Sequence, residues 1–134
     1  MYFIVSDINP KKDLSFNYHI KDLEDVSVKL LKPISVFLNA SKCFMIPEGF
    51  ISDGSSYPFN FSEALKKKEI RAAIVHDYFC KEDNQGLLNQ KETHSLFRQI
   101  LKEDGVGFFK RSLMFAAVRL ANHRFINSNN RDWR

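Results

Sequence analysis

Residues 71–80 read Arg71-Ala72-Ala73-Ile74-Val75-His76-Asp77-Tyr78-Phe79-Cys80, an apolar run interrupted by an adjacent histidine and aspartate. The apolar residues fall on nearly every side of a helix, a pattern typical of a helix that is buried on several sides. Residues 66–80 are therefore predicted to form a central helix. Ionisable groups inside such a helix have to be paired, bind a metal ion or take part in chemistry.

A second polar segment precedes this helix and reads Ile46-Pro47-Glu48-Gly49-Phe50-Ile51-Ser52-Asp53-Gly54-Ser55-Ser56-Tyr57-Pro58. It places a carboxylate, Asp53, and the hydroxyls of Ser55 and Ser56 in a loop punctuated by glycine and proline. Glycine lets the backbone bend, and loops commonly carry the side chains of a functional site. We expect this loop to aim Asp53 toward the central helix.

The rest of the chain predicts an α+β fold, with a small antiparallel sheet in the N-terminal part followed by three packed helices. Apolar and polar residues alternate in 14–20, 26–30 and 34–38, which is a strand pattern, and Pro33 interrupts it. Residues 43–46 read as another short strand, after which Pro47-Glu48-Gly49 turns the chain before Phe50-Ile51. After the central helix, residues 88–103 form an amphipathic helix that ends at Asp104-Gly105-Val106-Gly107.

The third helix is predicted over residues 108–121. Its inward stripe is predicted to consist of Leu113, Met114, Ala117, Val118 and Ala121. The nearby aromatic residues Phe108, Phe109 and Phe115 are also expected in the core. At 134 residues the chain fits one domain, 1–134, with a polar tail at residues 127–134.

The net charge of +4 is concentrated at the C-terminal end. Residues 1–107 contain 14 Lys and Arg against 15 Asp and Glu, whereas residues 108–134 contain 6 against 1. Such a basic segment can contact nucleic acid or an acidic partner. A solvated helix face with basic residues near its C-terminus explains the same counts.

Several classes are not indicated by the sequence. No apolar run approaches the roughly 20 residues of a membrane span, and the first residues lack a secretory signal pattern. The two cysteines, Cys43 and Cys80, do not make a disulfide framework. We expect a cytoplasmic protein with free thiols that does not bind membranes, and we expect Cys80 to be buried and inert.

Four side chains, Asp53, His76, Asp77 and His94, are expected to meet in one cleft. His94 lies on the edge of the inward face of its helix, one turn before Phe97. Two imidazoles and one or two carboxylates suit a divalent transition ion such as Zn, Mn, Fe or Ni. In this hypothesis Asp53, His76 and His94 bind the metal. Asp77 is a further ligand or the catalytic base that orients a metal-activated water.

Two other interpretations of the same residues stay open. In a serine mechanism, Ser55 or Ser56 attacks, His76 is the base and an aspartate orients it, although the loop is unlike a Gly-x-Ser-x-Gly elbow. In a structural interpretation, Asp53 accepts backbone N–H bonds in its own turn. His76 and Asp77 then pair with neighbours such as Arg71, Tyr78 or His94. Asp77 and Ser56 are the catalytic candidates.

The same residues give the chain a family resemblance. The loop resembles a Pro-x-Gly-Phe-x-[Thr/Ser]-Asp-x-x-Ser-x-Pro motif, matched by Pro47, Gly49, Phe50, Ser52, Asp53, Ser56 and Pro58. The central helix resembles Arg-Ala-Ala-x-x-His-Asp-x-[Leu/Phe]-[Tyr/Cys], matched by Arg71, Ala72, Ala73, His76, Asp77 and Phe79. Phe97 matches the next helix. Over residues 25–120 the chain is thus similar to domain-of-unknown-function family 1353, a phage- and prophage-borne family. His94 replaces an aspartate of that family and Cys80 a tyrosine.

The resemblance implies one compact domain and a phage context, in the cytoplasm of an infected host or in the virion, and it implies no particular reaction. Two functions are consistent with the sequence. The first is a small metal-dependent hydrolase, related by analogy to lysis or cell-wall cleavage. The second is a non-enzymatic accessory or virion protein that binds a host or phage component, with a structural His/Asp cluster. Its working surfaces would be residues 108–134 and an exposed strand edge, and nucleic acid is an alternative partner of those residues.

Overall fold

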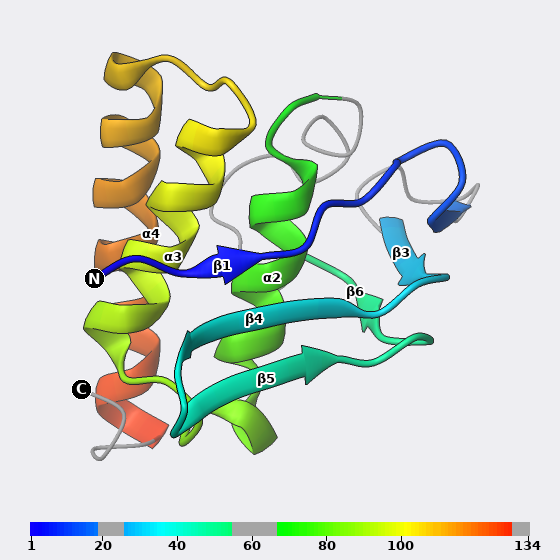
Figure 1. Cartoon of the computed structure of the whole chain (residues 1–134). Helices are drawn as coiled ribbons and strands as arrows, with labels where there is room; N and C mark the ends of the chain where they lie inside the picture. The colour runs from blue at the N-terminus through cyan, green and yellow to red at the C-terminus, as the bar shows by residue number, and fades with distance from the viewer. Residues whose placement is uncertain (19–25, 55–66, 130–134) are drawn as a thin grey trace.

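The computed structural model describes residues 1–18, 26–54 and 67–129. The architecture is α+β, as predicted, with the strands in the N-terminal part and the helices after them. Figure 1 shows α2 behind one sheet, with α3 and α4 stacked beside it. None of the helices in these described ranges is long and apolar enough to cross a membrane.

The strands form two small antiparallel sheets where the sequence predicts one. The first sheet contains β1 (Ile4–Val5), β4 (Ile34–Asn39) and β5 (Lys42–Ile46) in the order β1-β4-β5. The second contains β2 (Leu14–Tyr18), β3 (Val26–Leu30) and β6 (Ile51–Ser52) in the order β2-β3-β6. The predicted meander is therefore wrong at its centre, because β3 and β4 are consecutive in the chain but lie in different sheets.

Backbone chemistry at the two junctions explains this division. Pro33 stands between β3 and β4 and has no N–H to donate to a ladder. Gly49, at φ +93°, turns the chain after β5. The Gly49 N–H donates to Leu30 O at 2.8 Å, so the chain returns to β3, where Ser52 pairs with Val28. This turn carries Ser52 and Asp53 to the side of the central helix.

The central helix α2 (Ile70–Cys80) is buried along almost its whole length, as its all-round apolar sequence predicts. It begins four residues later than predicted and leads into a short 3-10 turn, η1 (Glu82–Asn84). Its apolar side chains join the core with residues of both sheets and of α3. The largest fully buried core residues are Phe3, Phe79, Phe97, Leu30, Ile34, Ile46, Ile74, Leu88, Leu96, Ile100 and Leu101.

Helix α3 (Gln90–Glu103) follows the sequence prediction most closely. Asn89 and Glu92 form a capping box at its start: the Asn89 side chain accepts from Glu92 N, and Glu92 accepts from Asn89 N. At its end Gly105, at φ +87°, lets the Val106 N–H donate to Leu101 O. The predicted inward residues of α3 are all buried, namely Leu96, Phe97, Ile100 and Leu101.

Helix α4 (Phe108–Asn129) differs from its prediction in two ways. It continues eight residues beyond the predicted end at residue 121, because residues 122–129 contain no proline or glycine to stop it. Its predicted inward stripe is also partly wrong. Met114 and Val118 are buried as expected, but Leu113 is 58% exposed.

Candidate functional site

Asp77 turns from α2 toward the second sheet. Its side chain is fully buried, and its Oδ2 accepts a hydrogen bond from Ser52 Oγ of β6 at 2.8 Å. One helical turn later, Lys81 Nζ lies 3.6 Å from the same oxygen and 3.1 Å from Asp53 Oδ1. A polar chain Ser52–Asp77–Lys81–Asp53 therefore runs from the core to the surface, where Asp53 is exposed.

The two carboxylates of this polar series keep Lys81 protonated. Burial alone would lower the pKa of Lys81, but the carboxylates of Asp77 and Asp53 outweigh that effect and raise the pKa. The ammonium group therefore stays charged at neutral pH. Two carboxylates from different elements consequently face one cationic centre.

His76 faces the other way, although it is adjacent to Asp77. Neighbouring residues of a helix diverge by about 100°, so His76 packs against α3. Its ring lies 5.5 Å from that of His94, stacked, and 5.0 Å from that of Phe97, centroid to centroid. Cys80 Sγ lies 3.5 Å from His76 Nε2. Cys80 is buried, as predicted.

Both buried imidazoles are neutral at pH 7. Burial lowers the pKa of His76 to about 3, and the neighbouring His94 lowers it further in the same direction. Burial also lowers the pKa of His94 to about 4, with a smaller contribution from the positive charge of Arg119. The histidine pair is thus an uncharged contact between α2 and α3.

The four residues predicted to meet are brought together as two pairs. His76 and His94 lie between α2 and α3, whereas Asp53 and Asp77 lie on the β6 side of α2 and are joined by Lys81. Ser55 and Ser56 lie outside the described residues. Within the described ranges, no group of three or more His, Cys, Asp or Glu side chains is placed to hold a metal ion. The ligand set Asp53, His76 and His94 stays a prediction.

Arg71 has a larger role than its sequence position indicates. It is buried near the start of α2, where its Nε and Nη2 donate to the two carboxylate oxygens of Asp104 at 3.0 and 2.9 Å. Nη2 also donates to Glu103 at 3.2 Å, and Nη1 donates to Ser6 O at 3.0 Å. Arg71 therefore ties α2 to the end of α3 and to the chain after β1. The sequence indicated Arg71 by its place in the family motif and as a candidate partner of His76 or Asp77, but not its ion pairs with Asp104 and Glu103.

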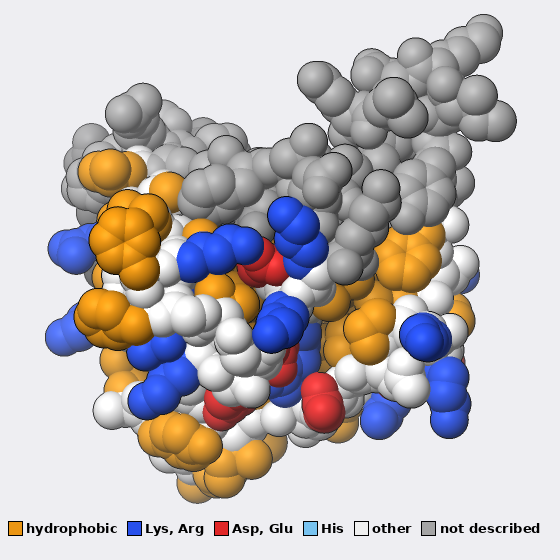
Figure 2. Space-filling model, turned by 90° about the horizontal axis from the view of Figure 1, so that it is seen from above, with side chains coloured by type: hydrophobic (Ala, Val, Ile, Leu, Met, Phe, Trp, Pro, Cys, Tyr) orange, Lys and Arg blue, Asp and Glu red, His pale blue; other side chains and the backbone are white. Residues whose placement is uncertain are grey.

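The outer face of α4 carries exposed apolar side chains, and three of them, Phe108, Phe109 and Leu113, were wrongly predicted to lie in the core. Phe108 and Phe109 are 65% and 76% exposed, and Leu120 is 63% exposed. Phe115 is half-buried beside His94. In the view from above, exposed hydrophobic side chains gather on the side of the molecule formed by α3 and α4 (Figure 2). Phe109, Leu113, Ala116 and Leu120 follow one side of the helix and are called the α4 stripe below.

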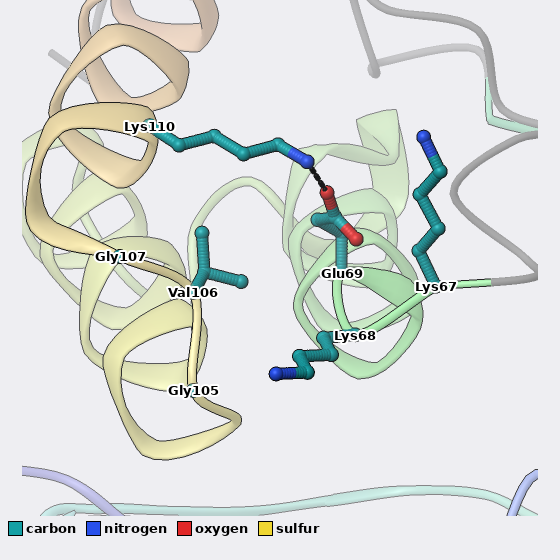
Figure 3. Close-up of a pocket in the computed structure, with 7 residues that line it drawn as sticks. All are labelled: Lys67, Lys68, Glu69, Gly105, Val106, Gly107 and Lys110. Atoms are coloured by element: carbon teal, nitrogen blue, oxygen red, sulfur yellow. Dashed lines mark ion pairs between the residues drawn. The ribbon is translucent and has the colours of Figure 1, made fainter.

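A pocket of about 450 Å³ lies between the beginnings of α2 and α4 (Figure 3). It is called the lysine pocket below, because Lys67, Lys68 and Lys110 line it with Glu69, Gly105, Val106 and Gly107. Lys110 of α4 forms an ion pair with the buried Glu69 across this pocket. No sequence pattern predicted the pocket, because its lysines come from segments far apart in the chain.

Comparison with known families places this site in context. A family model described as "Protein of unknown function (DUF1353)" matches residues 28–118. The chain belongs to the DUF1353 family. The matched part of this DUF1353 protein contains Asp53, His76, Asp77, His94 and most of the α4 stripe. No curated protein and no solved structure matches the chain.

Proposed function

We propose that this DUF1353 protein is a non-enzymatic accessory protein that binds a protein partner through the outer face of α4. The observation that carries the proposal is the exposure of three large apolar side chains, Phe109, Leu113 and Leu120, on one side of one helix. Exposed apolar patches that are bordered by polar residues commonly mark interaction sites. Burying each of these side chains would contribute about 1.5–3 kcal/mol, so they are the expected anchors.

In this proposal the buried polar residues of α2 hold the fold together. Asp77 joins α2 to β6 through Ser52, and His76 packs α2 on α3 through His94 and Phe97. Buried contacts of this kind fix the relative position of the elements that they join. They set the position of α3, on which α4 packs.

The phage context implied by the family resemblance supports a partner of one of two kinds. We propose a host protein or a virion protein, met in the cytoplasm of the infected cell or in the virion. Basic residues in 108–134 then contribute to protein recognition.

Site-specific photo-crosslinking tests this proposal. A crosslinking amino acid replaces Leu113 in the stripe or, as a control, the equally exposed Met45 of β5. We expect one protein of the infected cell or virion to crosslink from position 113 only. That protein, once purified, should bind Leu113→Ser about tenfold more weakly than the original chain. Equal crosslinking from both positions, or none from position 113, contradicts the proposal.

A hydrolase is the second candidate, favoured by the convergence of Asp53 and Asp77 on a single cation. In this alternative a divalent ion takes the place of the Lys81 ammonium between the two carboxylates. Carboxylate and hydroxyl oxygens suit Mn and other hard ions, whereas Zn, Fe or Ni would favour imidazole ligands such as His76 or His94. A bound ion of this kind would lower the pKa of its water and supply a hydroxide nucleophile.

Calorimetric titration with Mn²⁺ and Zn²⁺ tests the second candidate. Lys81→Met removes the competing ammonium group, so it should bind the ion more tightly than the original chain. Asp53→Asn should bind it more weakly, because one of the two carboxylates is lost. An absence of binding heat in all three proteins counts against this alternative.

A further inference from the structure

The α4 stripe has the spacing of a coiled-coil seam. Phe109, Leu113, Ala116 and Leu120 are separated by steps of four, three and four residues. This is the spacing with which one helix presents knobs to a second helix. The exposed Ala116 lies near the middle of the stripe, where a small side chain lets a partner backbone approach closely. The four residues span about 16 Å of helix, which is three turns.

The stripe is narrow because the opposite side of α4 is occupied. Met114 and Val118 are buried against the rest of the molecule, on the side of α4 away from the stripe. A helix that lies on a membrane surface usually presents a broad apolar face. The α4 stripe instead has one apolar residue for every 3.5 residues of helix, and such a seam matches the narrow apolar edge of another helix.

The charged residues that α4 itself places beside the stripe are all basic. Helical geometry places Lys110 on one border of the stripe and Arg119 on the other, at about 90° from its centre. Residues 108–129 contain no aspartate or glutamate. Lys110 also lines the lysine pocket, where it is ion-paired with Glu69, and Lys67 and Lys68 leave the pocket with an excess of positive charge.

From this spacing and charge we infer that the partner presents an amphipathic helix whose apolar edge is flanked by aspartate and glutamate. The inference rests on the proposed binding function and specifies its partner. Acidic flanks would face Lys110 and Arg119 across the seam, which favours both recognition and fast association. A second copy of this chain fits less well, because two α4 helices would bring cation against cation.

Synthetic helical peptides of three heptads test the inference directly. Three peptides share one leucine seam and carry Glu, Gln or Lys at the flanking positions, and their binding to the full chain is measured by fluorescence anisotropy. We expect the Glu peptide to bind about tenfold or more tightly than the Lys peptide, with the Gln peptide between them. Arg119→Glu should reduce that preference, and Leu113→Ser with Leu120→Ser should abolish binding of all three.

Several outcomes would overturn the inference. One is a Lys peptide that binds as well as the Glu peptide. Another is adsorption to anionic phosphatidylglycerol vesicles without peptide binding, and a third is self-association through the stripe in sedimentation without peptide binding. The proposed function fails separately: if position 113 crosslinks a partner that lacks an acidic helix, the binding function stands and this inference falls. If neither a peptide nor a protein contacts the stripe, both fall.

Discussion

Helices α2 and α4 have similar sequences in one respect and opposite surroundings. Neither has one sharp apolar face: α2 is apolar on nearly all sides, whereas in α4 apolar and basic residues are mixed around the helix. α2 is covered by the strands and by α3 (Figure 1), and the buried surface includes charged and polar groups such as Asp77 and His76. α4 packs on α3 and leaves Phe109, Leu113 and Leu120 exposed. Apolar side chains require cover, and within the described residues both sides of α2 receive it but the outer side of α4 does not.

The two helices therefore depart from ordinary burial in different ways: α2 buries polar residues, and α4 exposes apolar residues. Buried polar groups are expected to be satisfied, and in α2 Asp77 is satisfied by Ser52 of β6 and Arg71 by Asp104. The exposed apolar groups of α4 have no such contacts within the described residues, and the proposed binding function rests on them. Substitutions in α2 should consequently lower the stability, whereas substitutions in the α4 stripe should change binding.

The largest effect is expected at Arg71. Arg71→Met leaves Asp104, Glu103 and a backbone carbonyl without their buried donor, so the free energy of unfolding should fall by about 3–5 kcal/mol. Denaturant unfolding measures the change. Arg98→Met is the control, because Arg98 is exposed and lies over Phe115. If Arg71→Met loses no more unfolding free energy than Arg98→Met, the contacts of Arg71 do not hold α2 in place.

The next largest effect is expected on acidification. His76 and His94 have pKa values of about 3 and 4 in the folded chain and about 6.5 when unfolded, so only the unfolded state gains their protons between pH 6.5 and these lower values. Their contribution to the free energy of unfolding is complete above pH 6.5 and is lost as the pH falls toward their folded-state pKa values. At pH 4 His76 alone should lower the unfolding free energy by on the order of 3 kcal/mol.

A double variant isolates this effect from the titration of carboxylates. His76→Gln with His94→Gln keeps two polar, uncharged side chains in the contact. Its stability should change less between pH 7 and pH 4 than that of the original chain. The same loss in both proteins would show that the pair is not buried as described.

A smaller effect distinguishes two adjacent residues of α4. Met114 is 4% exposed and Leu113 is 58% exposed. Met114→Ala should lower the unfolding free energy by about 2 kcal/mol or more, whereas Leu113→Ala should change it by less than about 0.5 kcal/mol. Thermal and denaturant unfolding measure both variants. Equal losses would place Leu113 in the core, as the sequence alone predicts.

The sequence predicted the fold best where local patterns decide the structure. Helix α3 was predicted well because its apolar side, its glycine stop and its length agree. The two sheets were not predicted, because alternation shows which residues share a face and does not show which strands pair. The pairing of β3 with β6 depends on the Gly49 turn, which returns the chain to Leu30.

The sequence predicted which residues lie near one another at the candidate site, but only part of how they are arranged. His76 with His94, and Asp53 with Asp77, do approach each other, but the adjacent residues His76 and Asp77 face different neighbours. Lys81 was not foreseen as the link, because a long flexible side chain reaches groups that spacing does not identify. Leu113 was wrongly placed in the core, because an apolar residue in a sequence does not show whether its side chain packs inside its own chain or stays available to another molecule.

The most direct test of the account is the unfolding free energy of Asp77→Asn, measured by denaturant titration at pH 7. Asparagine keeps the shape of the side chain but removes the charge beside Lys81 and the strong acceptor for Ser52. We predict that the protein becomes less stable by about 1–3 kcal/mol, because a buried polar contact is impaired. Unchanged or increased stability would contradict the account, since residues held for catalysis are commonly kept at the expense of stability.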